Sequence, residues 1–377
     1  MKKNRKLLSP ITFIRKGIEL KNRIVMAPMT TWASNEDFTV SHEEIEWYRS
    51  RIKGVGMVIT GCTQVTPEGI GFTDEFAGHD DQYIPSLRRL ADVAKSDGAP
   101  AILQIFHAGN KTYPELSPNG VVVSASAIKS EITPFSPPAL QVPRALEEQE
   151  ILDIIKAFGQ TTRRAIAAGF DGVEIHGAHG FLIQNFLSPM FNKRDDQWGG
   201  NIGNRMRLAL EIVREVKRVI AEFSAKPFLL GFRISPEELP EEGLRLKDSM
   251  ALVDALIQEN VDYLHFSLFQ VLSQKPLYSN TTKVTAQVLS SYINGRVPMI
   301  AAGELTTPEE AELALNSGLD LAAIGRGMVI NPDWALQAYQ EIPDITMVLD
   351  LKKLTEKSIP EKLVPIINGA KGWIKTA

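Results

Sequence analysis

Eight short apolar runs, rich in β-branched residues, constrain the fold of this chain more than any other feature of its sequence. They begin near Asn22, Val55, Pro100, Asp171, Pro227, Val261, Val297 and Leu319. The runs are continuously apolar rather than alternating, which is typical of strands buried on both faces of a parallel sheet. Every interval between them has room for a crossover helix. The pattern predicts an α/β fold, a (β/α)8 TIM barrel, with a doubly wound sheet plus a cap domain as the alternative.

Several intervals carry explicit helix signals. Ser-x-x-Glu at 41–44 and Thr-Pro-x-Glu at 307–310 are capping-box patterns, and Gly318 is a natural end for the second helix. Apolar residues spaced by three or four predict amphipathic helices over 151–166 and 204–223. In the second of these the expected buried stripe consists of Met206, Leu210, Val213, Val216 and Ile220.

We predict one domain over residues 1–377, with the barrel spanning about 8–340. An excursion after the third strand, about 108–146, is rich in proline and lacks helical periodicity. The valines at 121–123 predict a strand or hairpin within it, so an ordered lid is favoured over a linker. A short C-terminal helical extension is expected over about 345–377, most clearly at 349–356.

Composition narrows the class of protein. The 41 Lys and Arg residues against 45 Asp and Glu give a net charge of −4, so nucleic acid is not an expected partner. Cys62 is the only cysteine, which excludes an intramolecular disulfide and a cysteine-ligated iron–sulfur cluster. The basic N-terminus runs into Ser9-Pro10 without the apolar region of a signal peptide, and no apolar run is long enough to span a membrane. A soluble, cytoplasmic protein that acts on small molecules is therefore expected.

Two histidines follow the fourth run, at the strand end where barrels place their chemistry. His176 and His179 are three residues apart within His-Gly-Ala-His-Gly and can converge on one ligand atom. They can donate two N–H bonds to a carbonyl or oxyanion, or they can ligate zinc in a metal-dependent hydrolase or lyase. No nearby carboxylate is placed as a third ligand, so we expect no metal.

The last two runs end in glycines. Gly303 follows the seventh run, and Gly325-Arg326 follows the eighth, where barrels commonly bind phosphate. Glycine lets the backbone approach a phosphate, and arginine adds a fixed charge. Arg233 lies near the end of a buried run, so its charge must be paired or must face an anionic ligand.

Together, several stretches resemble the Old Yellow Enzyme family of FMN-dependent NAD(P)H oxidoreductases, in register from about residue 8 to 340. The matching stretches are LKNRIVMAPMT at 20–30, QIFHAG at 104–109, GFDGVEIHGAHG at 169–180, the loop 188–205 and AAIGR at 322–326. The resemblance implies FMN lying across the strand ends, with NADH or NADPH as electron donor. Because relatives often form dimers or tetramers, the resemblance also allows a homo-oligomer.

The resemblance also implies roles for individual residues. The phosphate of FMN would meet Gly303, Gly325 and Arg326. The pyrimidine side of the flavin would bond Gln104 and Arg233, and its other edge would lie against Pro28, Met29, Thr30 and Cys62. An electron-poor acceptor, such as an α,β-unsaturated carbonyl or a quinone, would then bind through its carbonyl oxygen to the catalytic pair His176 and His179.

The substrate pocket departs from the family pattern at two positions. Phe181 stands where many members carry a tyrosine that protonates the substrate, and Trp32 stands where others place a different aromatic residue. Either another group or water supplies the proton, with Tyr113 and the lid as candidates, or the chain is a flavin-binding barrel with little alkene reductase activity.

Overall fold

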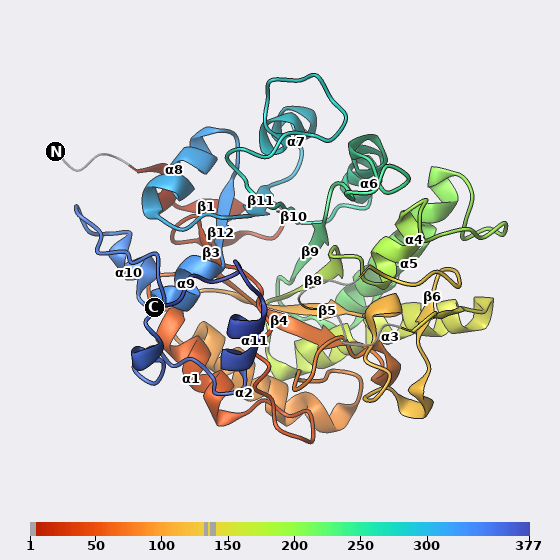
Figure 1. Cartoon of the computed structure of the whole chain (residues 1–377), viewed down its shortest axis with the longest axis horizontal. Coiled ribbons are helices and arrows are strands. Elements are labelled where there is room, and N and C mark those ends of the chain that lie inside the picture. Colours follow the sequence, from red (N-terminus) through yellow and green to blue (C-terminus); the bar gives the residue numbers. More distant parts are fainter. Residues whose placement is uncertain (1–4, 132–134, 136–140) are drawn as a thin grey trace.

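A closed barrel of eight parallel strands forms the centre of the computed structural model, which describes residues 5–131, 135 and 141–377 (Figure 1). Around the barrel the strands follow the order β10, β11, β12, β3, β4, β5, β8, β9. Their bounds are β3 (Ile24–Met26), β4 (Met57–Gln64), β5 (Ala101–Phe106), β8 (Gly172–Gly177), β9 (Leu229–Ile234), β10 (Tyr263–Ser267), β11 (Met299–Ala302) and β12 (Leu321–Ile324). All eight predicted runs are strands. The pairing of β12 with β3 closes the barrel and rules out the doubly wound sheet.

Helices cover the outside of the barrel and alternate with the strands along the chain. They are α1 (His42–Arg51), α2 (Ile84–Lys95), α3 (Glu148–Ala168), α4 (Leu182–Leu187), α5 (Ile202–Phe223), α6 (Leu246–Gln258), α7 (Thr285–Ile293), α8 (Pro308–Asn316), α9 (Arg326–Ile330) and α10 (Trp334–Gln337). Both predicted capping boxes are formed, at Ser41 before α1 and at Thr307 before α8. Gly318 follows α8 with a φ of +119°, as expected for a glycine that ends a helix.

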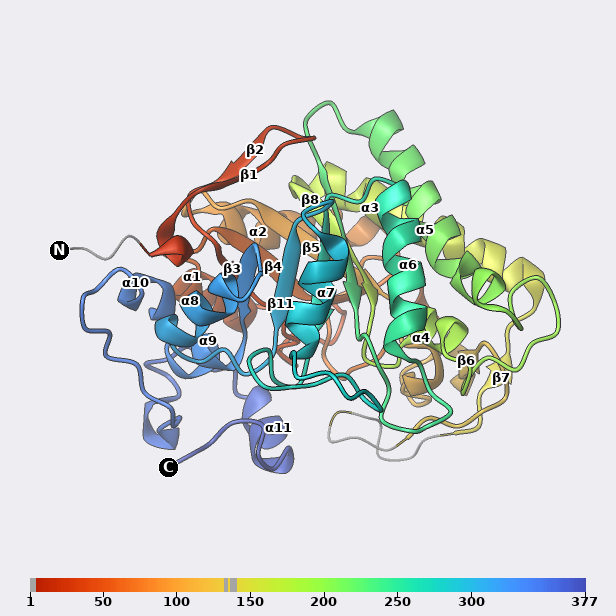
Figure 2. The ribbon, with the colours of Figure 1, turned by 90° about the horizontal axis from the view of Figure 1, so that it is seen from above.

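The hairpin of β1 (Ile11–Phe13) and β2 (Ile18–Leu20) closes the end of the barrel at which the strands begin (Figure 2). Phe13 and Leu20 join the interior apolar cluster, and the Phe13 ring lies 5.9 Å from that of Tyr263. Tyr263 crosses the interior beside Gly231, where an added Cβ would collide with the ring. The opposite end, where the strands finish, is the end that can take a ligand.

The buried face of α5 differs from the predicted one. Val213 and Val216 are fully buried as expected, whereas Met206, Leu210 and Ile220 are only half-buried. The rest of the buried face is formed by Leu208, Ala209, Ile212 and Val219. Apolar residues occur on both sides of the stripe, so spacing alone did not fix its centre, and packing against α3 decided it.

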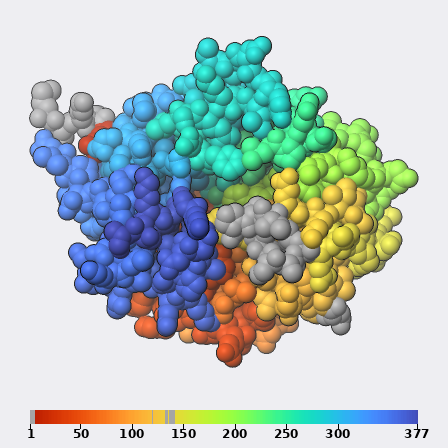
Figure 3. All heavy atoms as spheres, in the orientation of Figure 1, coloured from red at the N-terminus to blue at the C-terminus, as the bar shows by residue number. Residues whose placement is uncertain are grey.

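The described parts of the excursion, in yellow, and the tail, in dark blue, lie on the same face of the molecule (Figure 3). Within the excursion β6 (Val123–Ser124) pairs in parallel with β7 (Arg144–Ala145), which confirms a strand near the predicted valines. Residues 132–134 and 136–140 of the predicted lid lie outside the described residues.

The predicted helix over 349–356 is wrong. That segment forms only a 3-10 turn, Leu351–Lys353, and the helix of the tail is α11 (Leu363–Gly369). Leu349 instead pairs with the chain end, donating from its N–H to Lys375 O at 2.8 Å and accepting at its carbonyl from Ala377 N at 3.0 Å. In the described part of the chain every helix is too short or too polar to cross a membrane.

Candidate active site

The predicted site residues all lie at one end of the barrel. They are Pro28, Met29, Thr30 and Trp32 after β3, Cys62 in β4, Gln104 in β5, His176, His179 and Phe181 at and after the end of β8, Arg233 in β9, Gly303 after β11, and Gly325 and Arg326 after β12. Parallel strands point the same way, so their carboxyl ends share this face. The fold thus brings together residues that are far apart in sequence.

Hydrogen bonds orient the two histidines. Their ring centroids lie 4.9 Å apart at an interplanar angle of 73°. His176 Nδ1 accepts from Ala178 N at 3.1 Å, so its ring proton resides on Nε2. Ser267 Oγ accepts from Arg233 Nη2 at 3.2 Å and lies 2.6 Å from His179 Nε2. When the serine hydroxyl donates to His179 Nε2, the ring proton of His179 lies on Nδ1, and one N–H on each ring is then left for a ligand.

Both histidines are neutral at physiological pH. Desolvation lowers the pKa of each well below its usual value, and the charge of Arg233 adds to the effect on both. His176 is buried, whereas His179 lies at the exposed mouth of the site. His179 also has a φ of +60°, an uncommon conformation for a residue other than glycine, and such strain is concentrated at functional sites. Two preorganised neutral N–H donors suit a carbonyl oxygen that gains negative charge.

A buried carboxylate beneath the pair organises the barrel interior. Glu174 accepts from Gln104 Nε2 at 2.6 Å and pairs with His265 Nδ1 at 3.0 Å. Burial opposes its ionisation, but His265, Arg233 and Gln104 outweigh that effect and lower the pKa of Glu174. Sequence reasoning missed Glu174, although an acidic residue inside a buried strand is the same signal that identified Arg233.

Arg233 is a buried cation with unused hydrogen-bonding capacity. It forms no ion pair with any acid among the described residues, and its Nε has no hydrogen-bond partner there. Cys62 Sγ donates to Gln104 Oε1 at 3.3 Å, and burial raises the pKa of this thiol, which keeps it protonated. The orphaned donor of Arg233 fits a cofactor with an anionic edge.

The glycines after β11 and β12 lie beside a fixed cation. Gly303 has a φ of +154°, which side-chain-bearing residues rarely adopt, and a Cβ on Gly325 would stand 3.4 Å from Met29 Sδ. Arg326 pairs with Glu304 at 3.1 Å and donates from Nη1 to Trp373 O at 3.3 Å. Backbone free of side chains and an oriented guanidinium are the features that a phosphate site requires.

Aromatic rings line the site continuously from the histidines to the tail, and we call this series the aromatic wall. Phe181 lies 5.0 Å from His176 and 5.9 Å from Phe72, measured between ring centroids. Trp32 lies 5.3 Å from Phe72 and 6.4 Å from Trp373. Trp32 and Phe181 were predicted pocket residues, whereas Phe72 and Trp373 were not, because no local pattern shows that the chain end returns to the barrel mouth.

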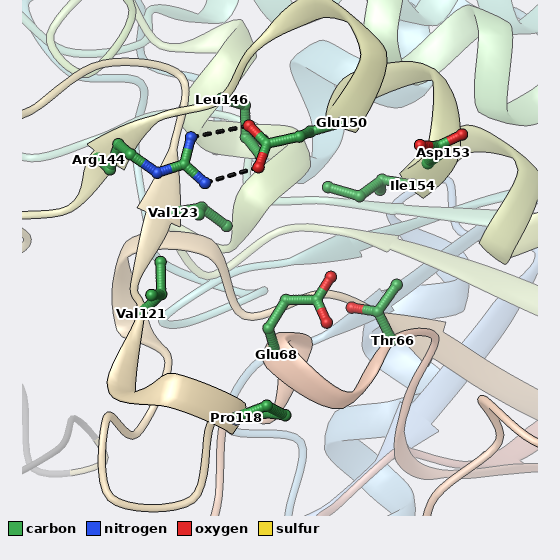
Figure 4. A pocket seen from close by; sticks show the side chains of 10 residues that line it. All are labelled: Thr66, Glu68, Pro118, Val121, Val123, Arg144, Leu146, Glu150, Asp153 and Ile154. Atoms are coloured by element: carbon green, nitrogen blue, oxygen red, sulfur yellow. Dashed lines mark hydrogen bonds and ion pairs between the residues drawn. The ribbon is translucent and has the colours of Figure 1, made fainter.

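A separate cavity of about 370 Å³ lies between the excursion and α3 (Figure 4). Its ten lining residues are Thr66, Glu68, Pro118, Val121, Val123, Arg144, Leu146, Glu150, Asp153 and Ile154, none of which is a predicted site residue. Arg144, its one basic residue, already pairs with both oxygens of Glu150, at 2.6 and 2.8 Å. Within the described residues no group of three or more His, Cys, Asp and Glu side chains is arranged to hold a metal ion.

Comparison with known proteins identifies the family. The model of the NADH:flavin oxidoreductase / NADH oxidase family matches residues 6–344. A probable NADH-dependent flavin oxidoreductase of Bacillus subtilis (strain 168) is 40% identical over 376 residues, covering 99% of this chain and 98% of that protein. An NADH:fumarate oxidoreductase of Klebsiella pneumoniae (strain 342) is 38% identical and matches 96% of this chain, but this match spans only 39% of the relative.

A solved structure agrees with this assignment. The Old Yellow Enzyme homologue from Zymomonas mobilis has a TM-score of 0.78 and 26% sequence identity, with 90% of this chain and 94% of that chain covered. Other relatives are named NADPH dehydrogenases. The chain is therefore an oxidoreductase that uses FMN, with NADH or NADPH as electron donor, rather than a metal-dependent hydrolase or lyase. It belongs to the NADH:flavin oxidoreductase / NADH oxidase family.

Proposed function

We propose that the chain is a single FMN-binding barrel domain that transfers hydride from NADH or NADPH, through the flavin, to an electron-poor acceptor such as an α,β-unsaturated carbonyl or a quinone. The observation that carries the proposal is the pair of neutral imidazoles at the end of β8. With His176 protonated on Nε2 and His179 on Nδ1, each ring keeps one N–H that no hydrogen bond among the described residues uses, and both rings stand beside the buried cation Arg233.

The residues present fit the flavin. FMN accepts hydride from the nicotinamide and returns it to the acceptor when it is bound. The phosphate would be held by Gly303, Gly325 and Arg326, the pyrimidine side by Gln104 and Arg233, and the other edge by Pro28, Met29, Thr30 and Cys62. The orphaned Nε of Arg233 supports this arrangement, because a negatively charged ring edge would provide the partner that the protein does not.

The chain's own side chains then bind and orient the acceptor. His176 and His179 donate to its carbonyl oxygen and stabilise the negative charge that develops there. Losing one such donor costs roughly 2.7–4 kcal/mol in enzymes that stabilise an oxyanion in this way. The aromatic wall would shield a bound acceptor from water on one side, which strengthens these hydrogen bonds.

The test is an anaerobic acceptor screen. The enzyme is reduced with NADH or NADPH and then mixed with 2-cyclohexenone, benzoquinone, fumarate or acrylate, the last two being acceptors named for relatives. The proposal predicts rapid return of the oxidised flavin spectrum with cyclohexenone and with benzoquinone. Reoxidation by benzoquinone alone would favour a flavin-binding barrel with little alkene reductase activity, as Phe181 allows, and no reoxidation by any acceptor would contradict the proposal.

A further inference from the structure

Reduction of an alkene needs a proton as well as a hydride, and the acceptor-binding pair is a poor source of it. Desolvation and the charge of Arg233 lower the pKa of both His176 and His179, so neither is an imidazolium acid at physiological pH. Phe181 has no acidic proton, and the Cys62 thiol is buried with a raised pKa and points its proton at Gln104. The inference below rests on the proposed function and concerns the group that supplies this proton.

The side chain of Lys111 lies beside the backbone carbonyl of His179 and the ring of Phe181. This residue ends the 3-10 turn Gly109–Lys111 that directly follows β5. Its Nζ donates to His179 O at 2.6 Å and lies 5.9 Å from the centroid of the Phe181 ring. A Cβ on Gly180 would stand only 3.0 Å from the same Nζ, so the ammonium lies closely against the loop that carries the pair.

The turn that carries Lys111 is fixed to the site. Asn110 N donates to Asn185 Oδ1 at 3.1 Å, and Leu182 N donates to His107 O at 3.0 Å. Both bonds tie the segment that follows β5 to α4, which begins directly after Phe181. The backbone position of Lys111 is therefore set by the fold.

The surroundings of Lys111 make its ammonium unusually acidic. The side chain is half-buried and forms no ion pair within the described part of the chain, and desolvation lowers its pKa to about 8. Glu238 and Glu131 act in the opposite direction, and the packed elements α4 and β6 contribute no titratable side chain. An acid whose pKa lies near the working pH is the most effective proton donor.

We propose that Lys111 donates the proton to the α-carbon of an alkene acceptor. Hydride adds to the β-carbon, the π-electron pair of the C=C bond shifts to the α-carbon and carbonyl, and the histidine pair holds the carbonyl oxygen. The N–H bond of the ammonium breaks as the α-carbon–hydrogen bond forms, and the neutral amine regains its proton from solvent. Tyr113, the other candidate, has no hydrogen bond or ring contact with the pair among the described residues.

Two substitutions separate proton donation from charge. K111M removes the proton and the charge, whereas K111R keeps the charge but its guanidinium does not give up a proton. K193M is the matched control, because Lys193 is exposed and its Nζ likewise donates to a backbone carbonyl, that of Pro189. The flavin spectrum of each holoenzyme checks folding and FMN content.

The measured quantity is the ratio of two flavin reoxidation rate constants, that with 2-cyclohexenone divided by that with benzoquinone, which takes its protons on oxygen. We expect the ratio to fall about 100-fold in both K111M and K111R and to be unchanged in K193M. In the wild type the cyclohexenone rate constant should decrease above about pH 8, where Lys111 loses its proton, and K111M should lack this decrease.

Three results would overturn the inference. A K111R variant that keeps the wild-type ratio would show that charge alone matters. A K111M variant that keeps it would remove Lys111 from the reaction while leaving the proposed function intact. A wild-type enzyme that reduces benzoquinone but no alkene would contradict the alkene part of the proposed function and the role of Lys111 with it.

Discussion

At the scale of single residues, the chemistry of the site depends on how burial sets protonation. His176 and His179 lose their charge because they are desolvated next to Arg233, whereas Glu174 keeps its charge because His265 and Gln104 bond to it. The site therefore holds two neutral hydrogen-bond donors, the histidines, together with the buried anion Glu174 and the buried cation Arg233.

Replacing both histidines with alanine should abolish phenol binding while the protein keeps its FMN. A phenol bound at this site as its phenolate would accept from both rings, and one hydrogen bond to a charged oxygen contributes about 1.5–3 kcal/mol. Each single variant should therefore bind phenol about 10- to 100-fold more weakly. Titration of the flavin absorbance with phenol measures this, and His42→Ala, in the first turn of α1, is the control. Wild-type phenol affinity in the double variant would remove the pair from the substrate site.

Glu44 should make the stability of the enzyme decrease with rising pH. Its buried carboxyl group accepts from Thr31 Oγ1 at 2.6 Å and from Ser34 Oγ at 3.0 Å, which ties α1 to the loop that carries Trp32. Burial raises the pKa of Glu44 to about 7 from 4.5. Between these values the folded state keeps a proton that the unfolded chain releases, so the free energy of unfolding falls as pH rises through this range.

Glu44→Gln removes that titration. The free energy of unfolding of the wild type, minus that of the variant, should decrease by roughly 3 kcal/mol between about pH 4 and pH 8. Denaturant unfolding at a fixed excess of FMN measures the difference at each pH. A difference that is constant across the range would mean that Glu44 titrates normally in the folded enzyme.

At the scale of elements, local signals were sufficient where an element is specified by its own residues. The eight strands and the capped helices α1 and α8 were predictable because buried runs and Ser or Thr caps act within a few residues. The buried face of α5 and the position of the helix in the tail could not be predicted from local signals, because contacts with distant parts of the chain determine both. Trp373 is the clearest case, since nothing near it in sequence indicates Trp32 or Arg326 as neighbours.

The tail should affect the flavin and the acceptor through different atoms. Deleting residues 373–377 removes the carbonyl that accepts from Arg326 and the backbone pairing with Leu349, so we expect FMN affinity to fall about 10-fold. Trp373→Ala keeps that carbonyl and should leave FMN affinity within about twofold while opening the aromatic wall. Quenching of FMN fluorescence on binding gives both affinities. An equal loss of FMN affinity in the two variants would show that the indole ring of Trp373, rather than its carbonyl group, is responsible for the loss.

At the scale of the whole molecule, the residues that close and stabilise the barrel and the residues of the candidate site lie at opposite ends. The β1–β2 hairpin and the interior apolar cluster close one end, and the strand ends at the other end carry the histidines, Arg233 and the glycines (Figure 2). The placement of the predicted site residues on one face follows from the sequence, because a closed parallel barrel puts every strand end there. Lys111, Glu174 and Trp373 could not be assigned this way, since their roles depend on which side chains meet inside that face.

The central claim is that this face binds FMN and that NADH or NADPH reduces it there. The most direct test is the visible absorbance spectrum of the FMN-reconstituted protein during an anaerobic titration with each nucleotide. We predict the two-band spectrum of bound oxidised flavin, bleached by at least one of the two nucleotides. A protein that takes up no FMN, or whose bound flavin neither nucleotide bleaches, would contradict the account.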